Sequence, residues 1–230
     1  VDMNLQFGNA TLFLNLKPQT SIIDVQRHIS EIDPEQLRKS LPRHSSGVSL
    51  LTGPIRVEEA ETFESNKFEA IISLLRASYN YILIDLPKNF DDLTMKTLDG
   101  SDVILKVFTT DIPSLFNTFR CFDIFKRLGY GEEKVLPVVN RFDDDGGSAL
   151  GQLKKPLAYP VFWKIPNQDY KTIISSINLG KPLSSDTPRS QFSQSIAELA
   201  EKLIGEDERG SGGEEEKEGL FRKIFRKKET

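Results

Sequence analysis

The sequence predicts an α/β protein in which a mostly parallel sheet lies between layers of helices. Two observations carry this prediction: apolar runs of strand length recur along the chain, and amphipathic helical patterns lie between them. That alternation is typical of βαβ units, which stack buried parallel strands. The 230 residues, 38% of them hydrophobic, are enough for one good-sized core. We therefore expect one globular domain followed by a tail.

At least five strands are expected in the sheet. The clearest apolar run extends from Tyr81 to Asp85, and the others cover residues 103–107, 135–139, 161–165 and, more weakly, 48–51.

Crossover helices are expected between these runs. Residues 68–76 and 114–128 carry apolar side chains three and four positions apart, as helices that cover a sheet do. A last core helix is expected from Ser190 to Ile204, with Gly205 ending it. Its apolar stripe consists of Phe192, Ile196, Leu199 and Leu203.

Three parts follow from this pattern: a domain over residues 1–205, a linker over 206–218 and an amphipathic segment over 219–230. The linker has seven acidic and two basic residues, for a local charge of -5, around a glycine-rich stretch. Such a segment buries too little apolar area to order itself, so we expect it to be flexible.

Composition limits the compartment and the partners. Cys121 is the only cysteine, and no secretory leader or run of about 18 apolar residues is present, which favours a cytoplasmic protein. The net charge of -4 argues against a general nucleic-acid binder, because such proteins need a basic face against phosphates.

Asp85 is the first candidate for chemistry. It stands at the carboxyl end of a buried strand, where ligands of open α/β sheets bind. A carboxylate there can hold a metal against nucleotide phosphates through bound water. An apolar run that ends in Asp is also common where a strand merely precedes a helix or a turn.

Four short stretches, in this order along the chain, decide between the two interpretations of Asp85. They are Asp2 to Asn9 (DMNLQFGN), Asp85-Leu86-Pro87, Val139-Asn140-Arg141 and Ile165-Pro166-Asn167. As a spaced set over residues 2–204 they resemble the MinD/ParA family of deviant Walker-A ATPases. Within that family they are most similar to the CpaE/TadZ branch, which serves pilus assembly.

The resemblance implies a three-layer P-loop NTPase-like fold and a site for ATP and Mg²⁺. Asp2 corresponds to the acid that positions the attacking water, and Asp85 to the Walker B acid that holds the magnesium. Asn140 corresponds to the residue that recognises adenine, with Arg141, Pro166 and Asn167 beside the nucleotide. From the residues alone, Asn140-Arg141 fits a polar strand end nearly as well, and Pro166-Asn167 fits a plain turn.

Three departures from the family pattern bear on activity. Asn4 stands where an acid is usual, and Lys88 stands where many relatives have glycine. The glycine-rich loop that cradles phosphates is not among the 230 residues. Val1-Asp2 also has the pattern of a strand's last two residues, so we expect an upstream segment to be absent. The chain as given is expected to bind ATP poorly.

The last segment, residues 219–230, is expected to form a short amphipathic helix. One side carries Leu220, Phe221, Ile224 and Phe225, and the other carries Arg222, Lys223, Arg226 and Lys227. This composition is typical of interfacial helices, and each cation adds about 1 kcal/mol near an anionic leaflet. The segment resembles the membrane-targeting end of MinD; a basic solvated tail or a protein-docking helix are the alternatives.

Three functions are compatible with this pattern. The first is an ATP-dependent dimerising switch of the CpaE/TadZ type, peripheral on the cytoplasmic face of the inner membrane, that positions pilus assembly or secretion proteins. The second is a scaffold of the same fold that does not hydrolyse ATP. The third is a chromosome or plasmid partitioning ATPase. The acidic net charge and a tail that is suited to binding lipid disfavour it.

Overall fold

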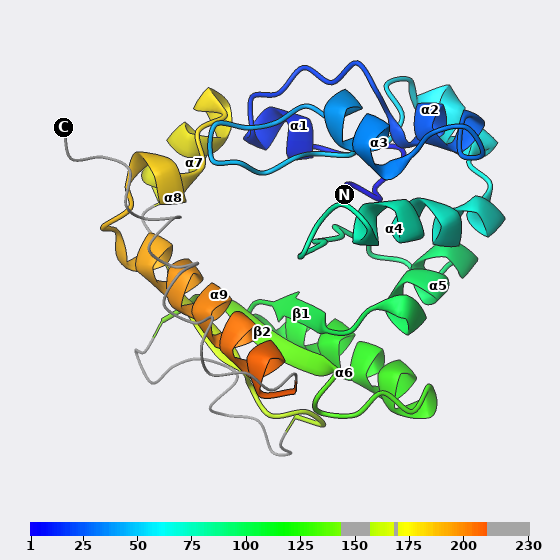
Figure 1. Cartoon of the computed structure of the whole chain (residues 1–230). Coiled ribbons are helices and arrows are strands. Elements are labelled where there is room, and N and C mark those ends of the chain that lie inside the picture. Colours follow the sequence, from blue (N-terminus) through cyan, green and yellow to red (C-terminus); the bar gives the residue numbers. More distant parts are fainter. Residues whose placement is uncertain (144–156, 168–169, 211–230) are drawn as a thin grey trace.

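A three-stranded parallel sheet organises the second half of the computed structural model, which describes residues 1–143, 157–167 and 170–210 (Figure 1). The strands are β1 (Ile104–Phe108), β2 (Val135–Phe142) and β3 (Trp163–Pro166), with β2 in the middle. Ile104 lies opposite Val135, and Val138 lies opposite Trp163. The expected parallel pairing is thus confirmed.

Two helices cover opposite faces of this sheet. On one face, α6 (Ile112–Arg127) packs Leu115 against Phe108 and Val139. On the other, α9 (Gln191–Gly210) packs Leu199 against Val138 and Ile165. Since successive side chains of a strand point to opposite faces, the neighbours Val138 and Val139 serve the two helices. The result is the expected three-layer α/β arrangement.

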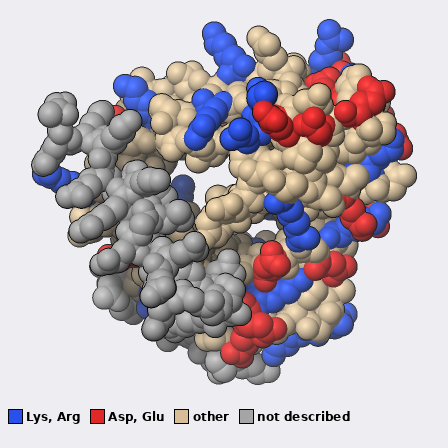
Figure 2. Space-filling view, in the orientation of Figure 1, with Lys and Arg blue, Asp and Glu red and all other residues tan. Residues whose placement is uncertain are grey.

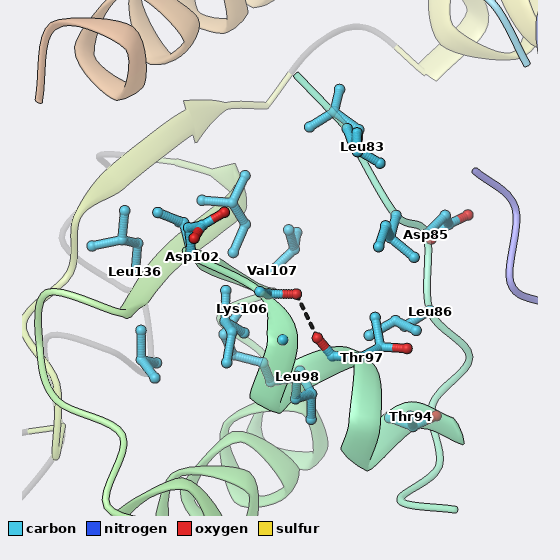
Figure 3. A pocket seen from close by; sticks show the side chains of 18 of the residues that line it. Leu83, Asp85, Leu86, Thr94, Thr97, Leu98, Asp102, Lys106, Val107 and Leu136 are labelled. Atoms are coloured by element: carbon cyan, nitrogen blue, oxygen red, sulfur yellow. Dashed lines mark hydrogen bonds between the residues drawn. The ribbon is translucent and has the colours of Figure 1, made fainter. Parts of the chain in front are cut away.

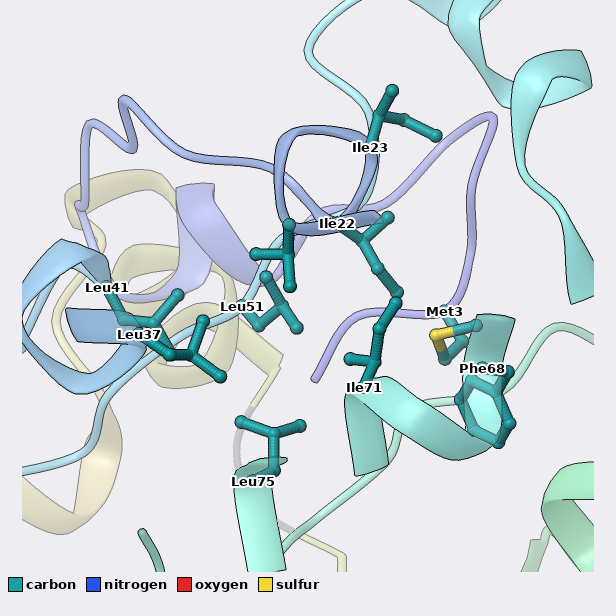
Figure 4. Close-up of a cluster of buried hydrophobic side chains, with 10 residues drawn as sticks. Met3, Ile22, Ile23, Leu37, Leu41, Leu51, Phe68, Ile71 and Leu75 are labelled. Carbon is teal, nitrogen blue, oxygen red and sulfur yellow. The ribbon is translucent and has the colours of Figure 1, made fainter. Parts of the chain in front are cut away.

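The first half of the chain has its own hydrophobic core (Figure 4). The helices that pack around it are α2 (Ile22–Arg27), α3 (Pro34–Ser40) and α4 (Phe68–Arg76), with 3-10 turns at Val57–Thr62 and Ser65–Lys67. Helix α1 (Ala10–Phe13) has no buried residue and lies outside this core. Met3 and Leu51 pack here against Ile22, Ile71 and Phe68, and all of them are buried. This core fixes the position of the chain's first residues.

Three further helices complete the described chain: α5 (Asp92–Gly100), α7 (Tyr170–Leu179) and α8 (Leu183–Asp186). In Figure 1 α5 leads from the first half to β1, while α7 and α8 return toward α1. Because α7 contacts α1, the described elements form a ring around a hollow, which is also visible in the space-filling view (Figure 2).

Two of the five expected strands do not form as such. Residues 81–85 and 48–51 make only isolated bridges, Asp2 with Asp85 and Arg43 with Ser49. A ladder needs a run of paired residues, whereas the 81–85 segment pairs only briefly, with Val1–Met3, along one side. The prediction of at least five strands is therefore wrong for the described residues.

The expected helices are present with shifted ends. Residues 68–76 match α4, and α6 begins two residues before the expected Ser114 because Asp111 caps it, accepting the Ser114 N–H at 2.9 Å. Helix α9 continues to Gly210, so Gly205 does not end it. Gly205 lacks the left-handed conformation of a terminating glycine. The apolar stripe of α9 packs on the sheet as expected.

The amphipathic segment at residues 219–230 and most of the predicted linker lie outside the described residues. Among the residues that the structure does describe, no helix has the length and apolar character to span a membrane.

Candidate nucleotide site

Asp2 and Asp85 lie side by side on adjacent parallel segments. The Met3 N–H donates to the Asp85 carbonyl and the Asp85 N–H donates to the Val1 carbonyl, both at 2.9 Å. This parallel bridge pairs Asp2 with Asp85 directly, and paired residues project from the same face of a sheet. Two acids with 82 residues between them in the sequence thus lie next to each other in the first half of the chain.

The Asp2 carboxylate organises the loop that follows it. It is 1% exposed, and its Oδ1 and Oδ2 accept the N–H groups of Asn4 and Ala10 at 3.1 and 3.2 Å. Ala10 is the first residue of α1, whose N-cap Asn9 makes no side-chain bond, so Asp2 takes the capping role. An ionised carboxylate has about four acceptor positions, so two remain for water or a metal-bound ligand.

Gly8 permits this close arrangement. A Cβ at Gly8 would lie 2.4 Å from Asp2 Oδ2, closer than any side chain allows. Asn4 Oδ1 meanwhile accepts the Phe7 N–H at 3.2 Å, which turns the chain toward Gly8. The stretch from Asp2 to Asn9, noted in the sequence as a motif, is therefore a loop folded around one carboxylate.

Asp85 is more open than Asp2. Partial burial, and then repulsion from the Asp2 carboxylate, raise the pKa of Asp85 above its ordinary value, while the nearby N-terminal ammonium opposes the rise. Asp85 also lines a large cavity together with Leu86 (Figure 3). A carboxylate at the edge of a cavity can accept hydrogen bonds from metal-bound water.

Asn140, Arg141, Pro166 and Asn167 form a second cluster, at the carboxyl ends of β2 and β3. Phe142 pairs with Pro166, and the Asn167 N–H donates to the Phe142 carbonyl at 3.0 Å. The register between the strands shifts here, and Arg141 has a φ of 52°. The Asn140 amide oxygen accepts the Arg141 N–H at 2.9 Å, so it stabilises this turn.

The structure thus brings the predicted site residues together as two groups, one around Asp2 and Asp85 and one around Asn140 and Asn167. Sequence reasoning overlooked the partners of Asp2, namely Gly8 and the N-terminus of α1. The glycine was visible as part of the motif, but its contact depends on a loop path that spacing alone does not give.

Among the described residues, no three His, Cys, Asp or Glu side chains gather as a metal cluster. Of the predicted set, Asp85 stays the residue that is expected to hold a metal through bound water.

In open parallel α/β sheets, ligands bind outside the carboxyl ends of the strands, where Asn140 and Asn167 lie. Comparison with known proteins shows which family this fold resembles. The chain is 24% identical over 214 residues to the septum site-determining protein MinD of Thermotoga maritima, covering 90% of this chain and 76% of that protein. It is 22% identical over 219 residues to MinD of Helicobacter pylori, covering 90% of this chain and 79% of that one. No protein-family model matches the chain.

Solved structures agree in fold. A ParA family ATPase from Chlorobium tepidum superposes with a TM-score of 0.78 at 22% identity, over 86% of this chain and 83% of that one. MinD of Pyrococcus horikoshii, solved with Mg-ADP, superposes with a TM-score of 0.66 at 20% identity, over 88% of this chain and 81% of that one. The fold is that of the MinD/ParA P-loop ATPases, and the resemblance inferred from the sequence is confirmed at this level.

Proposed function

We propose that the chain is the main part of an ATP-dependent dimerising switch that positions pilus assembly or secretion proteins at the inner membrane, as in the CpaE/TadZ branch. In the complete protein, Asp85 would hold the magnesium shell, Asp2 would position the attacking water and Asn140 would recognise adenine. Arg141, Pro166 and Asn167 would line the base.

One observation carries this proposal: Asp2 and Asp85 lie paired on neighbouring parallel segments. Two carboxylates on the same face at one level can act on a single phosphate–metal group, one on the metal and one on water. The Mg-ADP in the Pyrococcus horikoshii relative supports a magnesium nucleotide as the ligand class.

Magnesium-dependent nucleotide binding tests the proposal. In the protein that includes the phosphate-binding loop, Asp85→Asn should weaken Mg·ATP binding by about 10- to 100-fold, as loss of an outer-shell metal partner does. Asp102→Asn is a matched control, because Asp102 is exposed and lines the same cavity (Figure 3). Calorimetry on both variants gives the comparison, and equal affinities for wild type and Asp85→Asn contradict the assignment.

A scaffold without hydrolysis is the second candidate, and a specific observation favours it. Both Asp2 oxygens already accept backbone N–H groups, and the side chain is almost fully buried. Asn4 and Lys88, which depart from the family pattern, point the same way. Such a protein would bind Mg·ATP and dimerise with no phosphate release, whereas the switch would do all three.

Membrane attachment is assigned to Leu220, Phe221, Ile224 and Phe225, with Arg222, Lys223, Arg226 and Lys227 on the anionic headgroups. One such helix is a weak anchor, and two in a nucleotide-closed dimer gain avidity. Deleting residues 220–230 should abolish co-sedimentation with anionic vesicles. Unchanged sedimentation leaves protein docking as the role of this segment.

A further inference from the structure

Strand β2 ends in a bulge that lies next to the end of β3. Val139 lies opposite Lys164, and the next paired residues are Phe142 and Pro166, so two residues of β2 stand against one of β3. Arg141, one of these two, has a φ of 52°, in the left-handed region that residues with a side chain rarely adopt. Bulges are over-represented beside active sites, because they re-aim the side chains that follow them.

The bulge brings Asp143 beside Asn167. With an unbroken register Phe142 would lie opposite Asn167, whereas the extra residue shifts the pairing by one position. The Asn167 N–H donates to the Phe142 carbonyl, and the Asn167 side-chain Nδ2 donates to Asp143 Oδ2, both at 3.0 Å. Lys164 packs on the same strand end, with its Nζ 4.3 Å from the centroid of the Phe142 ring. Asp143 is therefore held by the end of β3, although it follows β2 in the chain.

These contacts leave a donor and an acceptor free at the strand ends. The Asn140 amide oxygen accepts the Arg141 N–H at 2.9 Å, so the Asn140 NH₂ group, with two donors, stays available. Asn167 occupies one oxygen of Asp143, so the other oxygen can accept, and an ionised carboxylate has no donor. Arg141 and Asp143 are exposed, and within the part of the chain that the structure describes neither takes part in an ion pair.

The two purine bases differ at the edge that carries N7. Adenine presents N7 as an acceptor and its amino group as a donor, whereas guanine presents N7 and O6, which are both acceptors. The NH₂ group of Asn140 matches N7 in either base, and the planar guanidinium of Arg141 can stack on either ring. The carboxylate of Asp143 matches the amino group of adenine and repels the O6 of guanine, since two acceptors cannot share a hydrogen bond. Of these three side chains, Asp143 alone distinguishes the two bases.

We propose that Asp143 selects adenine over guanine at this site, and that Asn167 is the residue that positions it. The Asp143 carboxylate accepts a hydrogen bond from the adenine amino group, while the Asn140 amide donates to N7. The inference rests on the proposed nucleotide-binding function and deepens it, because Asn140 by itself, with its oxygen held by Arg141, fits both purines. The base would lie outside the carboxyl ends of β2 and β3, where open parallel sheets bind their ligands.

Binding of ATP and GTP to wild type and Asp143→Asn tests the selection. In the protein that includes the phosphate-binding loop, wild type should bind Mg·ATP at least about tenfold more tightly than Mg·GTP. The new asparagine can turn its NH₂ group toward O6, so this preference for ATP should fall by about tenfold. Asp123→Asn removes the same charge from an exposed position of α6 and should leave the preference unchanged.

The outcomes separate this inference from the proposed function. If Asp143→Asn weakens ATP and GTP binding equally, or changes neither, Asp143 does not select the base, although the protein still binds nucleotide. A wild type that binds GTP as tightly as ATP likewise contradicts the selection alone. If wild type binds neither nucleotide, the proposed function and the selection both fail.

An ATP analogue without the amino group tests the hydrogen bond itself. Purine riboside triphosphate keeps N7 and the phosphates but has a hydrogen in place of the amino group. Wild type should bind it about tenfold more weakly than ATP, and Asp143→Ala should bind the two ligands equally. This comparison isolates the contact between Asp143 and the amino group, because a general weakening by the substitution affects both ligands. The same preference for ATP in wild type and in Asp143→Ala overturns the proposal.

Asn167→Ala tests the positioning role. Without the amide, Asp143 loses the partner that holds it at the end of β3, so the preference for ATP over GTP should fall by several-fold. Asn167 is exposed, so Tm should change little. An equal loss of affinity for ATP and GTP in Asn167→Ala would show that this residue shapes the strand end without positioning Asp143.

Discussion

Asp2 joins a structural and a proposed chemical role in one side chain. Its carboxylate accepts the N–H groups of Asn4 and Ala10, and Gly8 approaches so closely that only a missing side chain allows it. Any change in this loop therefore moves the acid that the proposal assigns to water. The same geometry explains why Asp2 is almost fully buried although it stands beside the more open Asp85.

Gly8→Ala is expected to destabilise the fold. The new Cβ would meet the Asp2 carboxylate at 2.4 Å, and overpacking of this kind costs about 1–3 kcal/mol. Urea unfolding gives the difference in the free energy of unfolding. Gly100→Ala is the matched control, because its Cβ meets no atom within 4 Å. Equal effects of the two substitutions would show that the Gly8 contact is not tight.

Asp85 should make stability depend on pH. Its pKa is raised in the folded protein by burial and by repulsion from Asp2, so the folded state holds this proton more tightly than the unfolded chain. Its contribution to the free energy of unfolding is complete below the unfolded pKa and is lost as the pH rises through the folded pKa. Urea unfolding from pH 3.5 to pH 7, about the ordinary Asp range and above, should show this loss in wild type. A constant difference between wild type and Asp85→Asn across that range contradicts the assignment.

At the scale of elements, α9 holds one face of the sheet through Leu199, which packs on Val138 and Ile165. The helix passes through Gly205 without the left-handed turn that would end it. A glycine inside a helix costs about 0.5–1 kcal/mol relative to alanine. The packing of α9 on the sheet offsets this free-energy cost.

Gly205→Ala distinguishes the two descriptions of this helix. If α9 continues past residue 205, alanine should stabilise the protein by about 0.5–1 kcal/mol, since a Cβ there meets open space. A helix ended by a left-handed glycine would be destabilised by the same change. Thermal unfolding of the two proteins decides between the outcomes.

Elements with local signals were predictable from the sequence, and those that depend on distant neighbours were not. Residues 68–76 carry their own helical pattern and form α4, as expected. The run from Tyr81 to Asp85 has a strand's composition but forms no ladder, because a strand requires partners on its edges. The meeting of Asp2 with Asp85 was predictable from the family order. The capping of α1 by Asp2 was not, since it depends on the path of one loop.

At the scale of the whole molecule, the described elements form a ring around a hollow, and the predicted site residues divide between the two halves of the chain. Asp2 and Asp85 belong to the first half, while Asn140 and Asn167 belong to the second.

Phosphate release in a single turnover tests the central claim most directly. In the protein that includes the phosphate-binding loop, Asp2→Asn retains one side-chain oxygen for the backbone but removes the charge that positions water. The account predicts that Asp2→Asn slows phosphate release by at least about 10²-fold and keeps the affinity for ATP. The control Asp123→Ala, at an exposed position of α6, should leave the rate of phosphate release unchanged. Equal rates of phosphate release for wild type and Asp2→Asn would contradict it.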